Sequence, residues 1–165
     1  MDFHVGDPVV HWTYGLGKVV AVEARLLAGQ ETRYYVVEVN DLTVWVPVDE
    51  EAKRRLRRPT SRAALKKALR ILGQSGRTLS EDRQERKLEL HRKLQDGSLE
   101  SVCGVIRDLA SFQARKGLND DEKLILKRAS ASLLGEWAYS CSVPISQAEQ
   151  QLNDLLRRPA VHHST

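Results

Sequence analysis

The feature that most constrains this chain is a change in the spacing of its apolar residues near residue 50. Before that point, short runs of β-branched and aromatic residues are separated by turn residues, which is typical of short β-strands. After it, apolar residues recur every three or four positions, the spacing of helices that bury one face. A strand-forming segment followed by helix-forming segments predicts an α+β chain with two domains.

The first fifty residues are expected to form a small antiparallel β barrel of the Tudor or SH3 type. The strand-forming runs are residues 5–10, 18–22, 34–39 and 42–46. Gly, Asn and Asp residues between these runs supply the turns, and Pro47 ends the last run because it cannot donate a ladder hydrogen bond. Small barrels of this size are usually binding modules.

The remainder is expected to form an all-α bundle of about five helices. The residues expected to open them are Ser61, Ser80, Ser98, Asn119 and Ser146. Glu122 and Glu149 follow the last two by three residues, which is the capping-box pattern. Trp137 is expected in the core, because it falls on the apolar stripe of the fourth helix.

These patterns divide the chain into a Tudor-like domain at residues 1–52 and a helical domain at residues 53–158. Residues 159–165 are expected to be a disordered tail, which holds two of the five histidines. The segment at 58–61 joins the two domains, and a helix follows it immediately, so a packed corner is expected there rather than a hinge.

Charge is distributed unevenly along the sequence. Residues 1–52 carry three basic and nine acidic residues, whereas residues 53–77 carry ten basic residues and no acid. A solvated helix face is the simplest interpretation of such a basic run. However, like charges without intervening acids repel one another, and a polyanionic partner explains the run better. With no aromatic residue in the run, it predicts a sequence-independent electrostatic contact.

Signatures of catalysis, of a metal site and of a cofactor site are absent from the sequence. Gly15 and Gly17 lie between strands and lack the third glycine of a phosphate-binding loop. Cys103 and Cys141 lie in separate apolar segments and are expected to be buried, reduced thiols. No apolar run is long enough to cross a membrane. We therefore expect a cytoplasmic, non-enzymatic protein without metal or cofactor.

Seven short segments of the chain carry a resemblance to a known family. They are VGDPVV at residues 5–10, GLGKVV at 15–20, DLTVWVPV at 41–48, IRDL at 106–109, RKGL at 115–118, EKL at 122–124 and LGE at 134–136. Their order and spacing resemble the CarD/CdnL family of bacterial regulators over about residues 1–156. The opening is also similar to the polymerase-interacting domain of the transcription-repair coupling factor. In that factor the barrel is part of a long translocase, whereas here the opening is followed by the helical segments of the CarD/CdnL family, which favours CarD/CdnL.

The resemblance implies that the barrel binds the β subunit of bacterial RNA polymerase and that the helical domain touches promoter DNA near the upstream fork. It places four residues in the polymerase contact: Arg25, Trp45, Val46 and Pro47. Trp45 either packs in the barrel or forms an exposed aromatic anchor, and the sequence leaves both open. The expected DNA contacts are Arg54, Arg55, Arg57, Arg58, Arg83, Arg86 and Lys87.

One departure from the family concerns the tryptophan that family members carry near the start of the second helix. That residue wedges into the minor groove at the fork, and here its place is taken by Arg83, flanked by Glu81 and Asp82. An arginine can enter a narrow minor groove, but it cannot wedge a base step as an indole does. Polymerase binding therefore carries over from the family, whereas stabilisation of the open complex by a wedge does not.

Two functions remain open at this point. The first is a monomeric, nucleoid-associated CarD-like transcription regulator that binds the polymerase β subunit and promoter DNA and modulates open-complex stability. The second is a protein-only interaction module, which docks on polymerase or another partner and has no wedge activity. Salt-dependent binding of DNA would distinguish the first from the second.

Overall fold

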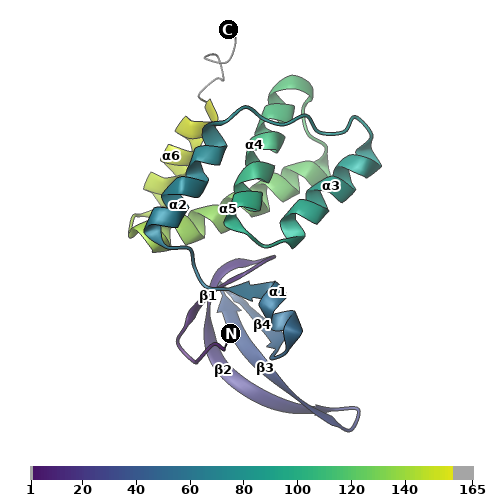
Figure 1. The fold of residues 1–165 in the computed structure, drawn as a ribbon, viewed down its shortest axis with the longest axis vertical. Helices are drawn as coiled ribbons and strands as arrows, with labels where there is room; N and C mark the ends of the chain where they lie inside the picture. Colours follow the sequence, from purple (N-terminus) through teal and green to yellow (C-terminus); the bar gives the residue numbers. More distant parts are fainter. Residues whose placement is uncertain (1, 158–165) are drawn as a thin grey trace. The chain divides into compact units, whose positions relative to one another are not determined.

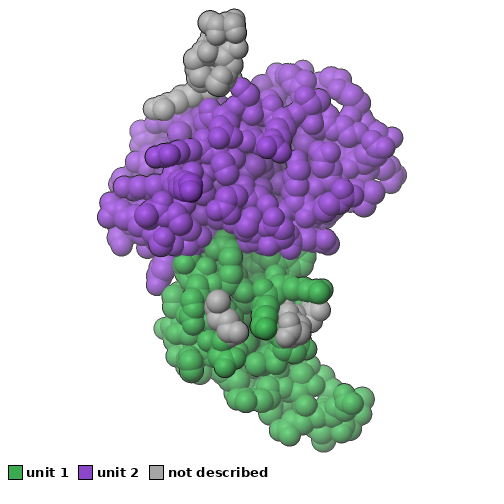
Figure 2. All heavy atoms as spheres, in the orientation of Figure 1, with its two compact units in different colours: residues 1–59 green, residues 60–165 purple. Residues whose placement is uncertain are grey.

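The computed structural model describes residues 2–157 (Figure 1). The chain divides into two compact units, an N-terminal unit at residues 1–59 and a helical unit at residues 60–165 (Figure 2). The boundary expected after residue 52 falls inside helix α1 (Glu50–Arg55). This helix belongs to the N-terminal unit, because Ala52 and Leu56 are part of that unit's core. The expected tail at 159–165 lies outside the described residues.

The N-terminal unit is a five-stranded antiparallel sheet, whose long β2–β3 hairpin extends beyond the other strands (Figure 1). Its strands are β1 (Pro8–His11), β2 (Gly15–Leu27), β3 (Gln30–Val39), β4 (Leu42–Pro47) and β5 (Leu56–Arg57). They lie in the order β4-β3-β2-β1-β5, so β4 is at one edge. The predicted Tudor-like β domain is confirmed.

The strand register separates the side chains of this sheet into an inner and an outer face. Val37 lies opposite Val19 and Val44, and all three belong to the core of the unit. On the other face, Val36 lies opposite Ala21 and Trp45. Because neighbouring residues of a strand point to opposite sides, every second residue of β3 and β4 belongs to this outer face, as does every second residue of β2 from Ala21 onward, after the bulge that follows Val19.

Close contact between β2 and β3 explains why the GLGKVV segment has a glycine at position 17. A Cβ atom at this position would lie 2.5 Å from the carbonyl oxygen of Glu38 and 2.6 Å from a methyl group of Val39. Any larger residue would therefore push β2 away from β3. The segment is a requirement of strand packing: it forms the start of β2 and opens no helix, so it lacks the geometry of a phosphate-binding loop.

The helical unit contains five α-helices and one short 3-10 helix in its described part. They are α2 (Arg62–Leu69), η1 (Arg70–Gly73), α3 (Arg83–Gln95), α4 (Leu99–Lys116), α5 (Asp120–Cys141) and α6 (Ile145–Arg157). One core cluster joins α2, α4, α5 and α6 and includes Trp137, which is buried as predicted. A second core joins Leu79 and Leu90 to residues of α4. The predicted α+β fold class with an all-α C-terminal domain is confirmed.

Three of the five predicted helix starts are confirmed. The hydroxyl groups of Ser61 and Ser98 accept hydrogen bonds from the amides of Ala64 and Ser101. Asn119 forms the full capping box with Glu122, in which each side chain accepts from the other residue's backbone amide.

The other two predicted starts are wrong by one or two residues. Helix α3 is capped by Asp82 instead of Ser80, because the Asp82 carboxylate accepts from two consecutive first-turn amides at 2.9 and 3.0 Å. The Ser80 hydroxyl instead binds the backbone amide of Asp82 and the carboxylate of Glu85. Helix α6 begins at Ile145, directly after Pro144, so Ser146 lies within its first turn.

Candidate functional site

Arg25 and Trp45 form a stacked pair on the outer face of the N-terminal sheet. The guanidinium carbon of Arg25 in β2 lies 3.9 Å from the centroid of the Trp45 ring in β4. The ring of Tyr34 in β3 meets that of Trp45 edge-on, with centroids 6.1 Å apart and planes at 75°. Trp45 is half-buried and Arg25 is exposed. The question left open for Trp45 is therefore settled: it is a partly exposed aromatic on the outer face and lies outside the core.

Pro47 and Val46 end up on opposite sides of β4. Pro47 lies opposite Tyr34 and shares the outer face with Trp45. Val46 is completely buried in the core, so the prediction that its side chain contacts a partner is wrong. The reason is the two-residue alternation of a strand, which places consecutive residues on opposite faces.

Sequence reasoning missed two members of this surface. Tyr34 packs against Trp45, and Leu27 follows Arg25 by two residues on the same face and is 56% exposed. Strand alternation counted from Arg25 and Trp45 would have found both. We call the surface formed by Arg25, Leu27, Tyr34, Trp45 and Pro47 the outer-face patch.

The basic run of the sequence is divided between the two units. Arg54 and Arg55 end α1, Arg57 lies in β5 and Arg58 follows it, all within the N-terminal unit. Arg58 forms an ion pair with Asp7 at 3.8 Å. Arg54, Arg55 and Arg57 also interact with other groups of the protein. Lys53 also lies in α1, and the other five basic residues of the run belong to the helical unit, so the run is not one continuous helix face.

Arg86 is a buried framework residue, and its prediction as a DNA contact is wrong. Its side chain is 6% exposed and forms an ion pair with Glu122 of α5. Its guanidinium also donates to the carbonyl oxygen of Ser80 at 2.9 Å and lies 4.7 Å from the centroid of the Phe112 ring. Arg86 thus joins three segments of the helical unit, and it has no free donor face to offer a phosphate.

Arg83 and Lys87 remain exposed on α3, one helical turn apart. The two acidic residues beside Arg83 have structural partners. Glu81 forms an ion pair with Lys116, and the hydrogen bond from Lys116 lowers the pKa of Glu81. Asp82 caps the helix. Both carboxylates are thereby partly compensated, which weakens the repulsion that they would exert on a polyanion near Arg83.

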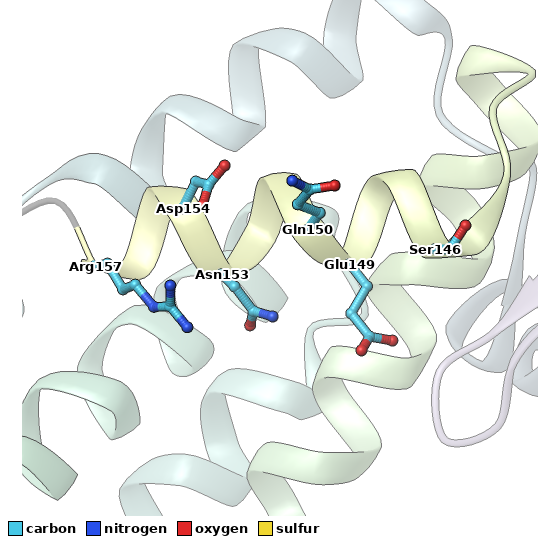
Figure 3. A pocket seen from close by; sticks show the side chains of 6 residues that line it. All are labelled: Ser146, Glu149, Gln150, Asn153, Asp154 and Arg157. Carbon is cyan, nitrogen blue, oxygen red and sulfur yellow. The ribbon is translucent and has the colours of Figure 1, made fainter.

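A hollow of about 320 Å³ lies over α6 and offers no catalytic arrangement (Figure 3). The residues that line it are Ser146, Glu149, Gln150, Asn153, Asp154 and Arg157. All six side chains project from the same helix, so no group from a second element converges on them (Figure 3). Within residues 2–157, no three His, Cys, Asp or Glu side chains are grouped as a metal site would require, and no helix is long and apolar enough to span a membrane.

Comparison with known families assigns both units. Residues 67–153 match the model of the CarD C-terminal domain, and residues 3–60 match that of the CarD-like/TRCF RID domain. The chain belongs to the CarD family. A relative from Bacillus subtilis (strain 168), named "Putative transcription factor YdeB", is 30% identical over 138 residues, which cover 81% of this chain and 89% of the relative.

The segments that carry the CarD resemblance in the helical unit contribute buried polar contacts. In IRDL, Arg107 and Asp108 form an ion pair at 3.0 Å, and both are nearly inaccessible. In LGE, the buried Glu136 accepts from the amide of Thr60 at 2.7 Å. The CarD segments of this unit are therefore explained by contacts that hold its fold. Residues that could contact a partner must be sought among exposed ones, such as those of α3.

Proposed function

We propose that this CarD-family protein is a transcription regulator that binds the β subunit of bacterial RNA polymerase through the outer-face patch. Exposed cations of α3 then contact promoter DNA near the upstream fork and modulate the stability of the open complex. The protein acts as a monomer in the cytoplasm, at the nucleoid, without a catalytic step or cofactor. The observation that carries the proposal is the Arg25–Trp45 pair, which occupies the positions that the family resemblance assigns to the polymerase contact.

The outer-face patch has the chemistry of a protein-binding surface. Arg, Trp and Tyr are enriched among the residues that dominate binding energy at protein interfaces. Stacking on Trp45 holds the Arg25 guanidinium in place before binding, so less conformational entropy is lost on association. Edge strand β4 adds a row of backbone groups to this surface, but not at Val46, which pairs with Tyr35 two positions from the Val48–Arg33 hydrogen bond and so directs its backbone groups toward β3.

The DNA contact is proposed for Arg83 and Lys87, with Arg54, Arg55, Arg57 and Arg58 of the N-terminal unit as secondary cations. Both α3 residues are exposed and lie on the same side of the helix. Contacts of this kind neutralise phosphates and release counterions, so they carry no base specificity. The contact is expected to be weak, because Arg86 is not available to it.

The second candidate is a protein-only module that docks on polymerase without touching DNA. The observation that favours it is Leu88, which is 62% exposed beside Lys87 on α3. An exposed leucine at this place suits a protein contact better than a contact with phosphates, because its side chain has neither charge nor a hydrogen-bond donor.

The polymerase contact is tested by a charge reversal with a matched control. Arg25→Glu is expected to weaken binding to purified bacterial RNA polymerase by about 2–4 kcal/mol, because a desolvated arginine at the centre of an interface is replaced by a repelled charge. Arg33→Glu is the control, since Arg33 is exposed on the opposite face of the same hairpin. Equal binding of Arg25→Glu and wild type in a fluorescence titration would remove the outer-face patch from the interface.

A further inference from the structure

A pocket of about 320 Å³ opens between η1, the segment that follows it, α3 and α4. Its polar lining includes Gln74, Arg77, Lys93, Ser101 and Arg107, and Ile71 adds an apolar wall. Unlike the hollow over α6, this pocket draws its side chains from several elements of the helical unit. Its volume is at the lower end of the range for small-molecule sites.

Asp108 fixes the cations around this pocket. Its side chain is 1% exposed and accepts from the Arg107 Nε at 3.0 Å and from the Arg77 backbone amide at 2.8 Å. The Lys93 ammonium lies 3.5 Å from the second carboxylate oxygen. The carboxylate is thus surrounded by donors, and it holds Lys93 and Arg107 at the pocket while its own charge is largely compensated.

Three cationic residues, Arg77, Lys93 and Arg107, line this pocket together with the acidic Asp108 and Glu100. Lys93 also lies 3.9 Å from Glu89 of its own helix. Arg107 donates through Nη1 to the Gln74 side chain at 3.1 Å, which fixes its plane. The Arg77 side chain is exposed, and that of Lys93 is 34% exposed. Glu100 is the second acidic residue of the lining, and it lies on the exposed side of α4.

We propose that this pocket binds a small phosphate monoester of about mononucleotide size. A monoester carries close to two negative charges at neutral pH and offers three terminal oxygens, which suits a lining that contains three cationic residues. The Ile71 side of the pocket accommodates the apolar part of such a ligand. A duplex backbone fits less well, because Arg107 is only 8% exposed and a diester in a groove wall cannot reach it.

Gly104 provides a way to close the pocket without changing its charge. It lies in the pocket lining on α4, and the nearest atom to a Cβ added there is an Arg107 nitrogen at 3.9 Å. Gly104→Met is therefore expected to fold, since Met is a better helix former than Gly, while its side chain fills the ligand space.

The test is a titration of the full chain with 5′-AMP, followed by amide NMR shifts. We expect saturable shifts at residues 74–77 and 100–108, about tenfold weaker binding for each of Arg77→Met and Lys93→Met, and loss of binding for Gly104→Met. Arg70→Met, an exposed cation outside the pocket lining, is the matched control. Absence of saturation, or unchanged binding by Arg77→Met and Gly104→Met, would overturn the proposal.

Three further ligands identify the source of the phosphate. Adenosine lacks the phosphate and should not bind. Cyclic AMP and a DNA duplex carry only diesters, so they should not reproduce the shifts. Affinity for 5′-AMP should rise between pH 5.5 and 7.5 as its second proton, with a pKa of about 6, is lost. No histidine lines the pocket, so no imidazole in the lining gains or loses a proton in this pH range. Equal shifts from the duplex would contradict a monoester site and assign the pocket to DNA.

Discussion

The two units of this protein expose their charged residues in different ways. In the N-terminal unit, Arg25 lies on an aromatic ring of the outer face and remains accessible. In the helical unit, Arg86 carries the same charge but is buried against Glu122 and Phe112. One arginine is available to a partner, and the other holds the fold together.

This contrast arises from the two kinds of secondary structure. A strand alternates its faces every two residues, so a few apolar positions determine where each polar neighbour points. A helix with a mainly polar sequence gives a weak pattern, and α3 buries Arg86 and Leu90 while exposing Leu88. Composition alone therefore does not distinguish a contact arginine from a framework arginine on such a helix.

The largest expected effect is the loss of the Arg86 framework contact. Arg86→Ala leaves Glu122 buried without its partner, which should lower the free energy of unfolding of the helical unit by about 3–5 kcal/mol. Arg83→Ala, on the exposed side of the same helix, should change it by less than about 0.5 kcal/mol. Urea denaturation followed by far-UV circular dichroism, which is dominated by the helices of this unit, measures both. Wild-type stability in Arg86→Ala would show that the buried ion pair with Glu122 does not hold the helical unit together.

A smaller effect separates two neighbouring residues of β4. Val46→Ala should destabilise the N-terminal unit by about 2 kcal/mol, because it leaves a cavity in the core, and should leave polymerase affinity unchanged in the folded protein. Trp45→Ala should have the opposite effect: it should weaken polymerase binding more than it lowers the stability of the N-terminal unit. Thermal denaturation measures the stability of each variant, and a polymerase titration measures its affinity. If both substitutions caused similar losses of stability and of polymerase affinity, Val46 and Trp45 would not act on opposite faces of β4.

The smallest expected effect is a pH dependence confined to the N-terminal unit. Burial, with a further contribution from Arg55, lowers the pKa of His11 from 6.5 to about 4. The unfolded chain therefore takes up a proton between these values while the folded chain does not. Stability from this source is complete above pH 6.5 and is lost as the pH falls toward 4, by about 1–2 kcal/mol at pH 5.

His11→Asn tests this origin, because its amide oxygen can replace Nδ1 as acceptor for the amide of Thr13. Unfolding of the variant should vary less between pH 7.5 and 5 than unfolding of the wild type. An identical pH slope in the two proteins would assign the acid sensitivity to other groups.

Much of the fold could be predicted from the sequence, because its signals are local. The period change near residue 50, the caps at Ser61 and Ser98 and the capping box at Asn119 all describe contacts within a few residues. The end of the first unit was placed too early, because the role of α1 depends on the long-range contacts of Ala52 and Leu56. No sequence pattern within a few residues of α1 indicates such long-range contacts.

The candidate site was predictable only in part. Arg25, Trp45 and Pro47 share an exposed face, as expected for residues of one contact. Val46 lies in the segment that resembles the family but not on the outer face, because strand alternation turns its side chain into the core. Arg86 was misassigned because its partner Glu122 is thirty-six positions away in the sequence, and only the packing of α3 against α5 brings them together. The cations around Asp108 were missed for the same reason.

The most direct test of the account is a titration against bacterial RNA polymerase with and without fork-junction promoter DNA. The wild type should bind the polymerase–DNA complex more tightly than polymerase alone, and this gain should decrease with salt. Arg83→Glu with Lys87→Glu should abolish the gain and leave binding to polymerase intact. Lys123→Glu with Lys127→Glu, an exposed pair of the same spacing on α5, should retain it. Equal wild-type affinity for both targets would contradict the DNA contact and leave a polymerase-docking module.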